Sequence, residues 1–108
     1  MEDEILHLYQ EPGIGASYTN TYGEENICNL LNKYRNLDKE GMQQMMEIVV
    51  NFSQSTDLAT SFVSVGVLHA LGQNEGVAEA YSWANTQEDA ERIINHFEIG
   101  KSVADYFF

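Results

Sequence analysis

Basic residues are scarce in this chain of 108 residues, where five Lys and Arg stand against 17 Asp and Glu and the formal net charge is -12. Residues 1–32 contain no Lys or Arg, and no Lys or Arg lies between Glu40 and Glu91. Binding to nucleic-acid phosphates or to anionic membranes depends on cationic side chains that displace counterions. We therefore expect neither a direct nucleic-acid contact nor a membrane contact. An acidic exterior attracts basic proteins, although it also serves solubility alone.

Cysteine occurs once, as Cys28, which excludes an internal disulfide framework and suits a reducing compartment. No apolar run approaches the roughly 20 residues that span a bilayer. The acidic start, Met1 to Glu4, lacks the positive charge of a secretory signal. We expect a cytoplasmic protein with a single helical domain over residues 1–108, since this length leaves room for one core.

The N-terminal part, residues 1–23, is expected to differ from the rest of the chain. Residues 1–10 are consistent with a short helix or an edge strand. Residues 11–23 are expected to form a loop, because Pro12-Gly13 and Gly15 break regular structure there. From residue 24 to 108 the apolar residues recur at helical spacing, which predicts a helical core.

Five helices are expected within that core. One begins at Glu24, and Asp38 is a candidate N-cap for the next. The third is capped by Ser55 or Thr56, ends at Gly72 and is apolar almost all round, which predicts that it is the buried centre. A fourth covers residues 75–84. The fifth is opened by a capping box of Thr86 and Asp89 and stops near Gly100.

Short connections between consecutive helices favour antiparallel packing. The predicted fold is all-α, a compact bundle or a short stack of antiparallel helical hairpins with about five to six helices. The aromatic tail, Tyr106 to Phe108, is expected to pack against the rest of the domain because exposure is costly. The predicted core residues are Met46, Val49, Phe62, Val65, Leu68, Ile93 and Ile94.

No catalytic constellation is apparent, so we do not expect an enzyme. Cys28 lies among Ile27, Leu30 and Leu31, which favours an inert core position over a nucleophile. No Gly-x-Ser-x-Gly elbow is present, and no local base and acid accompany a serine.

Metal and cofactor sites are also not expected. His7, His69 and His96 are isolated in sequence, and Glu4 to His7 is a single Glu-x-x-His motif where a di-metal bundle needs two. His69 is expected to be a hydrogen-bonded core or interface residue. Gly13-Ile14-Gly15 lacks the third glycine and the lysine of nucleotide-binding loops.

The remaining candidates are surface residues suited to binding a protein. Tyrosine and tryptophan anchor interfaces because each combines a large rigid area with one polar group. Pairs of carboxylates one helical turn apart offer a steering charge to a basic partner. The candidate partner-binding residues are Tyr18, Tyr22, Glu75, Glu79, Trp83, Glu88 and Glu91.

In size, charge and helix content the whole chain resembles the small acidic immunity proteins of bacterial polymorphic toxin and contact-dependent growth inhibition systems. The resemblance implies a tight complex that neutralises a cognate toxin domain, often a nuclease, by covering its active site. Two alternatives remain: a generic helical adaptor or assembly subunit, including a homo-oligomer formed by the apolar C-terminal tail, and a small enzyme built from His69, His96 and nearby acids.

Overall fold

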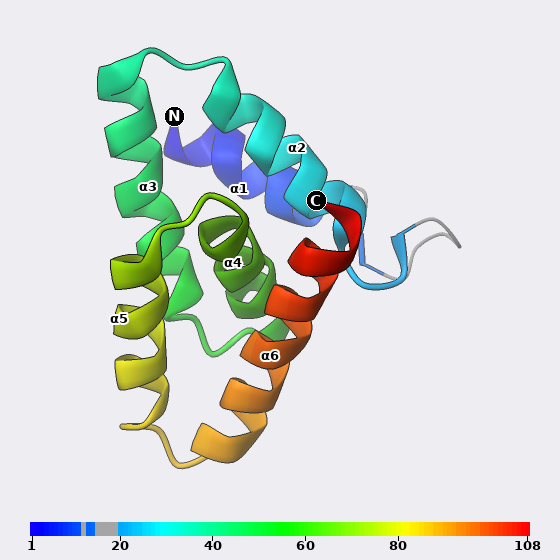
Figure 1. Ribbon diagram of the computed structural model, residues 1–108, viewed down its shortest axis with the longest axis vertical. Helices are drawn as coiled ribbons and strands as arrows, with labels where there is room; N and C mark the ends of the chain where they lie inside the picture. Colours follow the sequence, from blue (N-terminus) through cyan, green and yellow to red (C-terminus); the bar gives the residue numbers. More distant parts are fainter. Residues whose placement is uncertain (12, 15–19) are drawn as a thin grey trace.

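Six helices make up the described part of the chain, which is residues 1–11, 13–14 and 20–108 of a computed structural model. The predicted all-α bundle is confirmed, and residues 1–10 contribute a helix (Figure 1). Among the described residues no helix combines the length and the apolar character needed to cross a membrane. The helices are α1 (Glu2–Gln10), α2 (Glu24–Arg35), α3 (Lys39–Ser53), α4 (Leu58–Ala70), α5 (Asn74–Ala84) and α6 (Ala90–Phe107).

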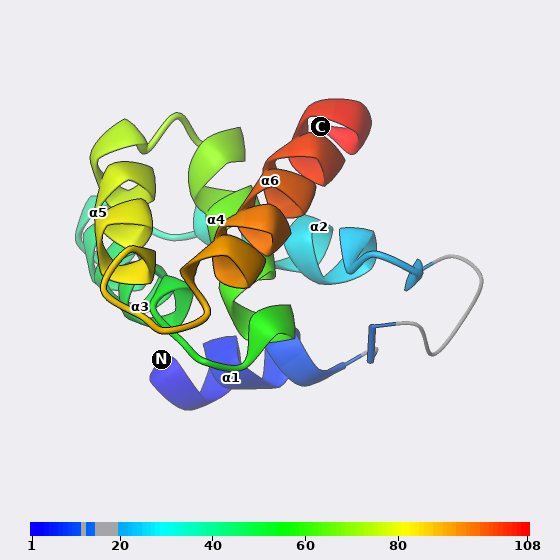
Figure 2. The same cartoon turned by 90° about the horizontal axis from the view of Figure 1, so that it is seen from below.

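Helix α4 is the centre of the bundle, as its sequence predicts. Every residue from Ser61 to Leu68 is buried. Figures 1 and 2 show α3 and α5 on one side of α4 and α2 and α6 on the other. The most extensive contact in the bundle is between α4 and α6, followed by that between α3 and α4. A helix apolar on all sides is stable only when neighbours cover it on all sides, and this arrangement provides that cover.

The core also draws on α1, through Ile5 and Tyr9, which are buried in the same cluster as residues of α2, α3 and α4. The Tyr9 ring lies edge-on to that of Phe52, with 5.1 Å between centroids. Of the predicted core residues, Met46 and Ile94 are only half-buried because they lie at the margins of the clusters. The others are buried, namely Val49, Phe62, Val65, Leu68 and Ile93.

The cap predictions are partly confirmed. Oδ1 of Asp38 accepts a hydrogen bond from the Gly41 backbone N–H at 2.7 Å, so Asp38 is the N-cap of α3. Gly72, which follows the C-cap Leu71 of α4, has a φ of 69°, the left-handed conformation expected of a terminating glycine. The prediction that Ser55 or Thr56 caps α4 is wrong, because the N-cap position is Asp57.

Both predicted ends of the last helix are wrong. Oγ1 of Thr86 donates to the Trp83 carbonyl at 2.6 Å and closes a turn, so α6 begins only at Ala90. Gly100 does not stop α6, which continues to Phe107. A Cβ at Gly100 would overlap the Phe62 carbonyl oxygen of α4. The glycine therefore serves a close crossing of two helices and does not terminate one.

The aromatic tail does not pack into the domain as expected. Tyr106 is 83% exposed, Phe107 48% and Phe108 49%. The last turns of α6 bury Val103 and Ala104 on one side. The aromatic side chains on the other side are not covered by any described helix.

Candidate protein-binding surfaces

The predicted binding residues lie in different regions of the bundle. Glu75 and Glu79 lie on α5, where it meets α3. Glu88 and Glu91 lie where the chain turns into α6. Tyr22 precedes α2 and lies beside the C-terminal end of α6. Tyr18 lies outside the described residues.

A groove of about 510 Å³ separates α3 and α5. Its apolar lining comes from Met46 and Val50 of α3 and Leu68 of α4. The two helices approach closely at Gly76, where an added Cβ would lie 3.1 Å from Cγ2 of Val50. A larger residue at position 76 would therefore narrow the groove.

Three carboxylates surround this groove, Glu47 from α3 and Glu75 and Glu79 from α5. None of the described residues that line it is Lys or Arg. All three side chains are exposed, and within the described chain no ion pair or side-chain hydrogen bond engages them. The groove thus combines an apolar strip with the amide side chains of Gln43, Asn51 and Gln73, and it carries unneutralised negative charge at its edges.

Glu4 of α1 shows the contrasting case of a paired carboxylate. Nζ of Lys33 donates to Oε2 of Glu4 at 2.6 Å, and this hydrogen bond and the lysine's charge lower the pKa of Glu4. The absence of such pairing at the groove distinguishes its carboxylates from Glu4.

The second predicted pair has a different setting. Glu88 lies in the turn before α6, and Glu91 lies in its first turn. They border a shallow hollow of about 400 Å³ together with Arg92 and His96. Nδ1 of His96 donates to the Arg92 carbonyl at 2.9 Å. Because the guanidinium of Arg92 lies in the same hollow, it partly offsets the negative charge of the carboxylates there.

Trp83 is half-buried and packs against a small core cluster that includes Ala84, Ile93 and Phe97. Its ring therefore contributes to the contact between α5 and α6, and only part of it is open to a partner.

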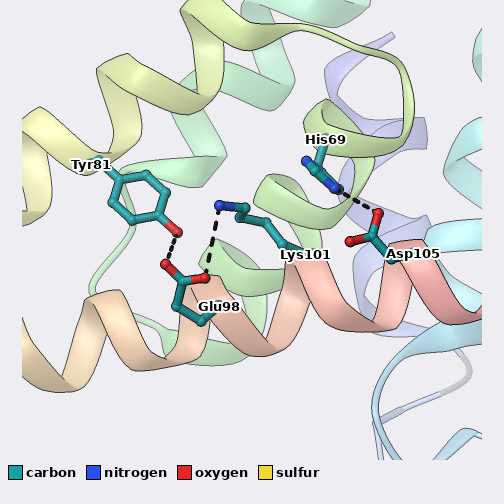
Figure 3. A network of polar contacts seen from close by, with 5 residues as sticks. All are labelled: His69, Tyr81, Glu98, Lys101 and Asp105. Carbon is teal, nitrogen blue, oxygen red and sulfur yellow. Dashed lines mark hydrogen bonds and ion pairs between the residues drawn. The ribbon is translucent and has the colours of Figure 1, made fainter.

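A polar network that the sequence did not reveal joins α6 to α4 and α5 (Figure 3). The Tyr81 hydroxyl donates to Oε1 of Glu98 at 2.9 Å, and Nζ of Lys101 lies 3.8 Å from Oε2 of the same carboxylate. Burial of Tyr81, with the neighbouring Glu98 carboxylate, raises the pKa of the phenol. Nε2 of His69 donates to Oδ1 of Asp105 at 2.8 Å. The network holds Glu98 and Asp105, the two acids of α6 beyond its first turn.

An aromatic patch lies at the C-terminal end of α6. It consists of Tyr22, Ile99, Val103, Tyr106 and Phe107, which border a hollow of about 490 Å³. The rings of Tyr106 and Phe107 are in edge contact, with 4.9 Å between centroids. The spacing i, i+4, i+7, i+8 from Ile99 is the sequence signal for this face, and the expectation that the helix stops at Gly100 obscured it.

Residues with catalytic or metal-binding chemistry are dispersed. Within the described residues no three His, Cys, Asp or Glu side chains gather closely enough to hold a metal ion. Nε2 of His7 lies 3.9 Å from Glu11, on an exposed face. Cys28 is half-buried rather than fully buried, and Nδ2 of Asn32 lies 3.7 Å from its Sγ.

Comparison with known proteins does not place the chain in a family. No family model matches it, and no curated protein or solved structure is significantly similar to it. Its function is therefore inferred from its own residues and surfaces.

Proposed function

We propose that this chain is a binding protein of the immunity type, which neutralises a cognate cationic toxin domain such as a nuclease by covering its active site. The observation that carries the proposal is the groove between α3 and α5, where Glu47, Glu75 and Glu79 surround a partly apolar floor without an internal counter-charge.

The groove suits a long basic side chain. Lys and Arg carry an apolar stem and a charged head, so the stem can lie on Met46 and Val50 while the head meets the carboxylates. A nuclease must present such cations in order to hold phosphates. Because the groove carboxylates have no intramolecular partner, no existing ion pair has to break when they bind one.

The overall charge favours fast capture. None of the 17 acids is buried, and a surface of one sign raises the rate of encounter with the opposite sign by about 10- to 1000-fold at low salt. An inhibitor that must act before its target reaches nucleic acid gains from such a rate.

The test begins with the partner, isolated from native cytosol by pull-down, identified by mass spectrometry and assayed for activity with and without this protein. Association rates across a salt series are then measured for wild type, for Glu75→Lys with Glu79→Lys, and for the matched control Glu88→Lys with Glu91→Lys. Both double variants change the net charge equally, so a difference between them reports on the groove.

We expect the groove variant to slow association by more than about tenfold at low salt and to flatten its salt dependence. The control should slow it by less than about threefold. A neutral or acidic partner, an association rate indifferent to salt, or equal effects of the two variants would contradict the proposal.

The second candidate function, a helical assembly subunit, is favoured by one observation. The aromatic patch on α6 leaves Tyr106 and Phe107 in water, and exposed apolar patches of this kind mark interaction sites. This candidate function predicts that the chain associates through the aromatic patch, without the need for a cationic partner.

A further inference from the structure

The second half of α6, together with the adjacent Tyr22, carries an apolar surface that no described element covers. Tyr106 is 83% exposed, Tyr22 57% and Ile99 43%, and Phe107 is half exposed beside them. Leaving side chains of this size in water forfeits their hydrophobic free energy. A surface of this kind, preformed by helix geometry and ring contact and yet open, is typical of an interaction site.

The size of this surface matches one side of a small dimer interface. An aromatic side chain offers about 200 Å², so the exposed fractions of Tyr22, Tyr106 and Phe107 leave roughly 400 Å². Ile99 and the neighbouring Phe108 raise the apolar total to about 500 Å². A standard interface buries about 800 Å² on each partner, of which about 65% is apolar in homodimers. The apolar area of the patch therefore agrees with the apolar area of one side of a standard homodimer interface.

The charge around the patch permits a second copy to approach. Two molecules of net charge -12 repel each other wherever unpaired carboxylates would meet. Near the patch, Glu98 is engaged by Lys101 and Tyr81, and Asp105 accepts a hydrogen bond from His69 (Figure 3). Glu24 accepts a hydrogen bond from the Tyr22 backbone N–H. The patch therefore differs from the groove between α3 and α5, whose carboxylates have no such partners.

The residues of the patch are also arranged for self-complementary packing. Ile99, Val103, Tyr106 and Phe107 follow one helix face at spacings of three and four residues. In a two-fold interface each contact occurs twice, with the roles of the copies exchanged. A two-fold axis near Val103, with the α6 helices antiparallel, brings Ile99 of one copy against Phe107 of the other.

We propose that the aromatic patch is the interface of a symmetric homodimer formed by antiparallel packing of α6 on α6. In Figures 1 and 2 the α3–α5 pair and the C-terminal end of α6 lie on opposite sides of α4. Each copy thus keeps its groove open, and the dimer presents two grooves. The proposal does not depend on the function proposed above.

The test is the mass of the purified chain by sedimentation and light scattering, between about 1 µM and 1 mM. We expect the mass to rise toward twice 12.2 kDa. Raising the salt should strengthen the dimer, because screening removes the repulsion between two anionic copies. The complex with a cationic partner should weaken under the same change, so the two interfaces respond to salt in opposite directions.

Ile99→Glu is the disruptive variant, and Leu6→Glu is its matched control, since Leu6 is 39% exposed on α1, away from the patch. Ile99→Glu should raise the dimer dissociation constant by more than about tenfold, and Leu6→Glu by less than about twofold. Circular dichroism checks folding, and Tyr106→Ser, at a side chain that is almost fully exposed, gives a second disruption without a folding cost.

A chain that stays monomeric to about 1 mM overturns the proposal, as does a dimer unaffected by both Ile99→Glu and Tyr106→Ser. A monomer whose capture of the cationic partner is lost in Ile99→Glu also overturns it and assigns the patch to that partner. Loss of the dimer with unchanged partner binding supports the two-surface arrangement.

Discussion

The Cα of Gly100 on α6 lies directly against the carbonyl oxygen of Phe62 on α4. The reciprocal position is Gly66 on α4, where an added Cβ would lie 3.0 Å from the Gly100 carbonyl oxygen. The two helices therefore cross backbone to backbone, at the most extensive contact in the bundle. Only residues without a Cβ allow this approach.

Gly100→Ala should destabilise the protein by about 1–3 kcal/mol, because the new methyl group overpacks the crossing. This loss outweighs the roughly 1 kcal/mol that alanine gains over glycine within a helix. Gly76→Ala is the control, since the three atoms nearest to its Cβ outside the α5 backbone would be side-chain methyls, Cγ2 of Val50 at 3.1 Å and the two Cδ atoms of Leu68 at 3.4 Å. Urea unfolding measures both, and a Gly100→Ala variant as stable as the wild type would contradict the crossing.

Phe62→Ala should cost about 3–5 kcal/mol, because it leaves a large cavity beside the buried face of α4. Phe62 is only 7% exposed, whereas Phe108 is 49% exposed. Phe108→Ala should therefore change the free energy of unfolding by less than about 0.5 kcal/mol. A loss below about 1 kcal/mol for Phe62→Ala would mean that α4 is wrongly placed.

The buried phenol of Tyr9 should make stability depend on alkaline pH. Oγ of Ser64 donates its single hydrogen to the Thr60 carbonyl at 2.8 Å, so the Tyr9 hydroxyl is the donor in its 2.6 Å bond to Ser64. Burial raises the pKa of Tyr9 in the folded state. Tyrosine in the unfolded chain ionises near pH 10, so this contribution to stability is complete below about pH 10 and is lost as the pH rises above it.

Tyr9→Phe removes both the hydrogen bond to Ser64 and the hydroxyl group that ionises. It should lower stability by about 1 kcal/mol at neutral pH, and the difference from wild type should shrink above about pH 10. Ser64→Ala is the control, because it keeps the buried phenol and should retain the alkaline loss. Denaturant unfolding from neutral to alkaline pH provides the comparison, and a pH-independent difference for Tyr9→Phe would refute the assignment.

Glu79→Lys should leave the fold intact and raise stability by about 0.2–0.5 kcal/mol. It replaces a like-charge i,i+4 pair with Glu75 by an opposite-charge pair in the favourable orientation. Glu98→Lys is the contrast, since Glu98 is held by Tyr81 and Lys101, and it should not gain stability. Thermal unfolding distinguishes the two. A stabilised Glu79→Lys would indicate that the groove carboxylates do not serve the fold, whereas a loss above about 1 kcal/mol would mean that they do.

Much of the fold could be predicted because helix periodicity is a local signal. The spacing of apolar residues located all five helices after residue 23, and the apolar character of α4 predicted its central position. The errors concern the caps of α4 and α6, the role of Gly100 and the aromatic tail. A glycine that ends a helix and a glycine that allows a close crossing look alike in sequence, since only the neighbouring Phe62 carbonyl distinguishes them.

The surfaces were less predictable, because each joins residues far apart in the chain. Glu75 and Glu79 were identified as a pair, but Glu47 joins them only through the packing of α5 on α3. Tyr22 was identified as a candidate anchor, whereas its neighbours Ile99 and Tyr106 come from the other end of the chain. Trp83 was expected at the surface, and its packing against Phe97 depends on the angle between α5 and α6.

The central position of α4 has a consequence for synthesis. Helix α4 leaves the ribosome before α5 and α6, so its Gly66 face stays without its main cover until the chain beyond Gly100 has been made. During that interval the most apolar segment of the protein is available to chaperones or to aggregation. A chain that ends shortly before Gly100 lacks this cover, and we expect it to be more prone to aggregation than the whole domain.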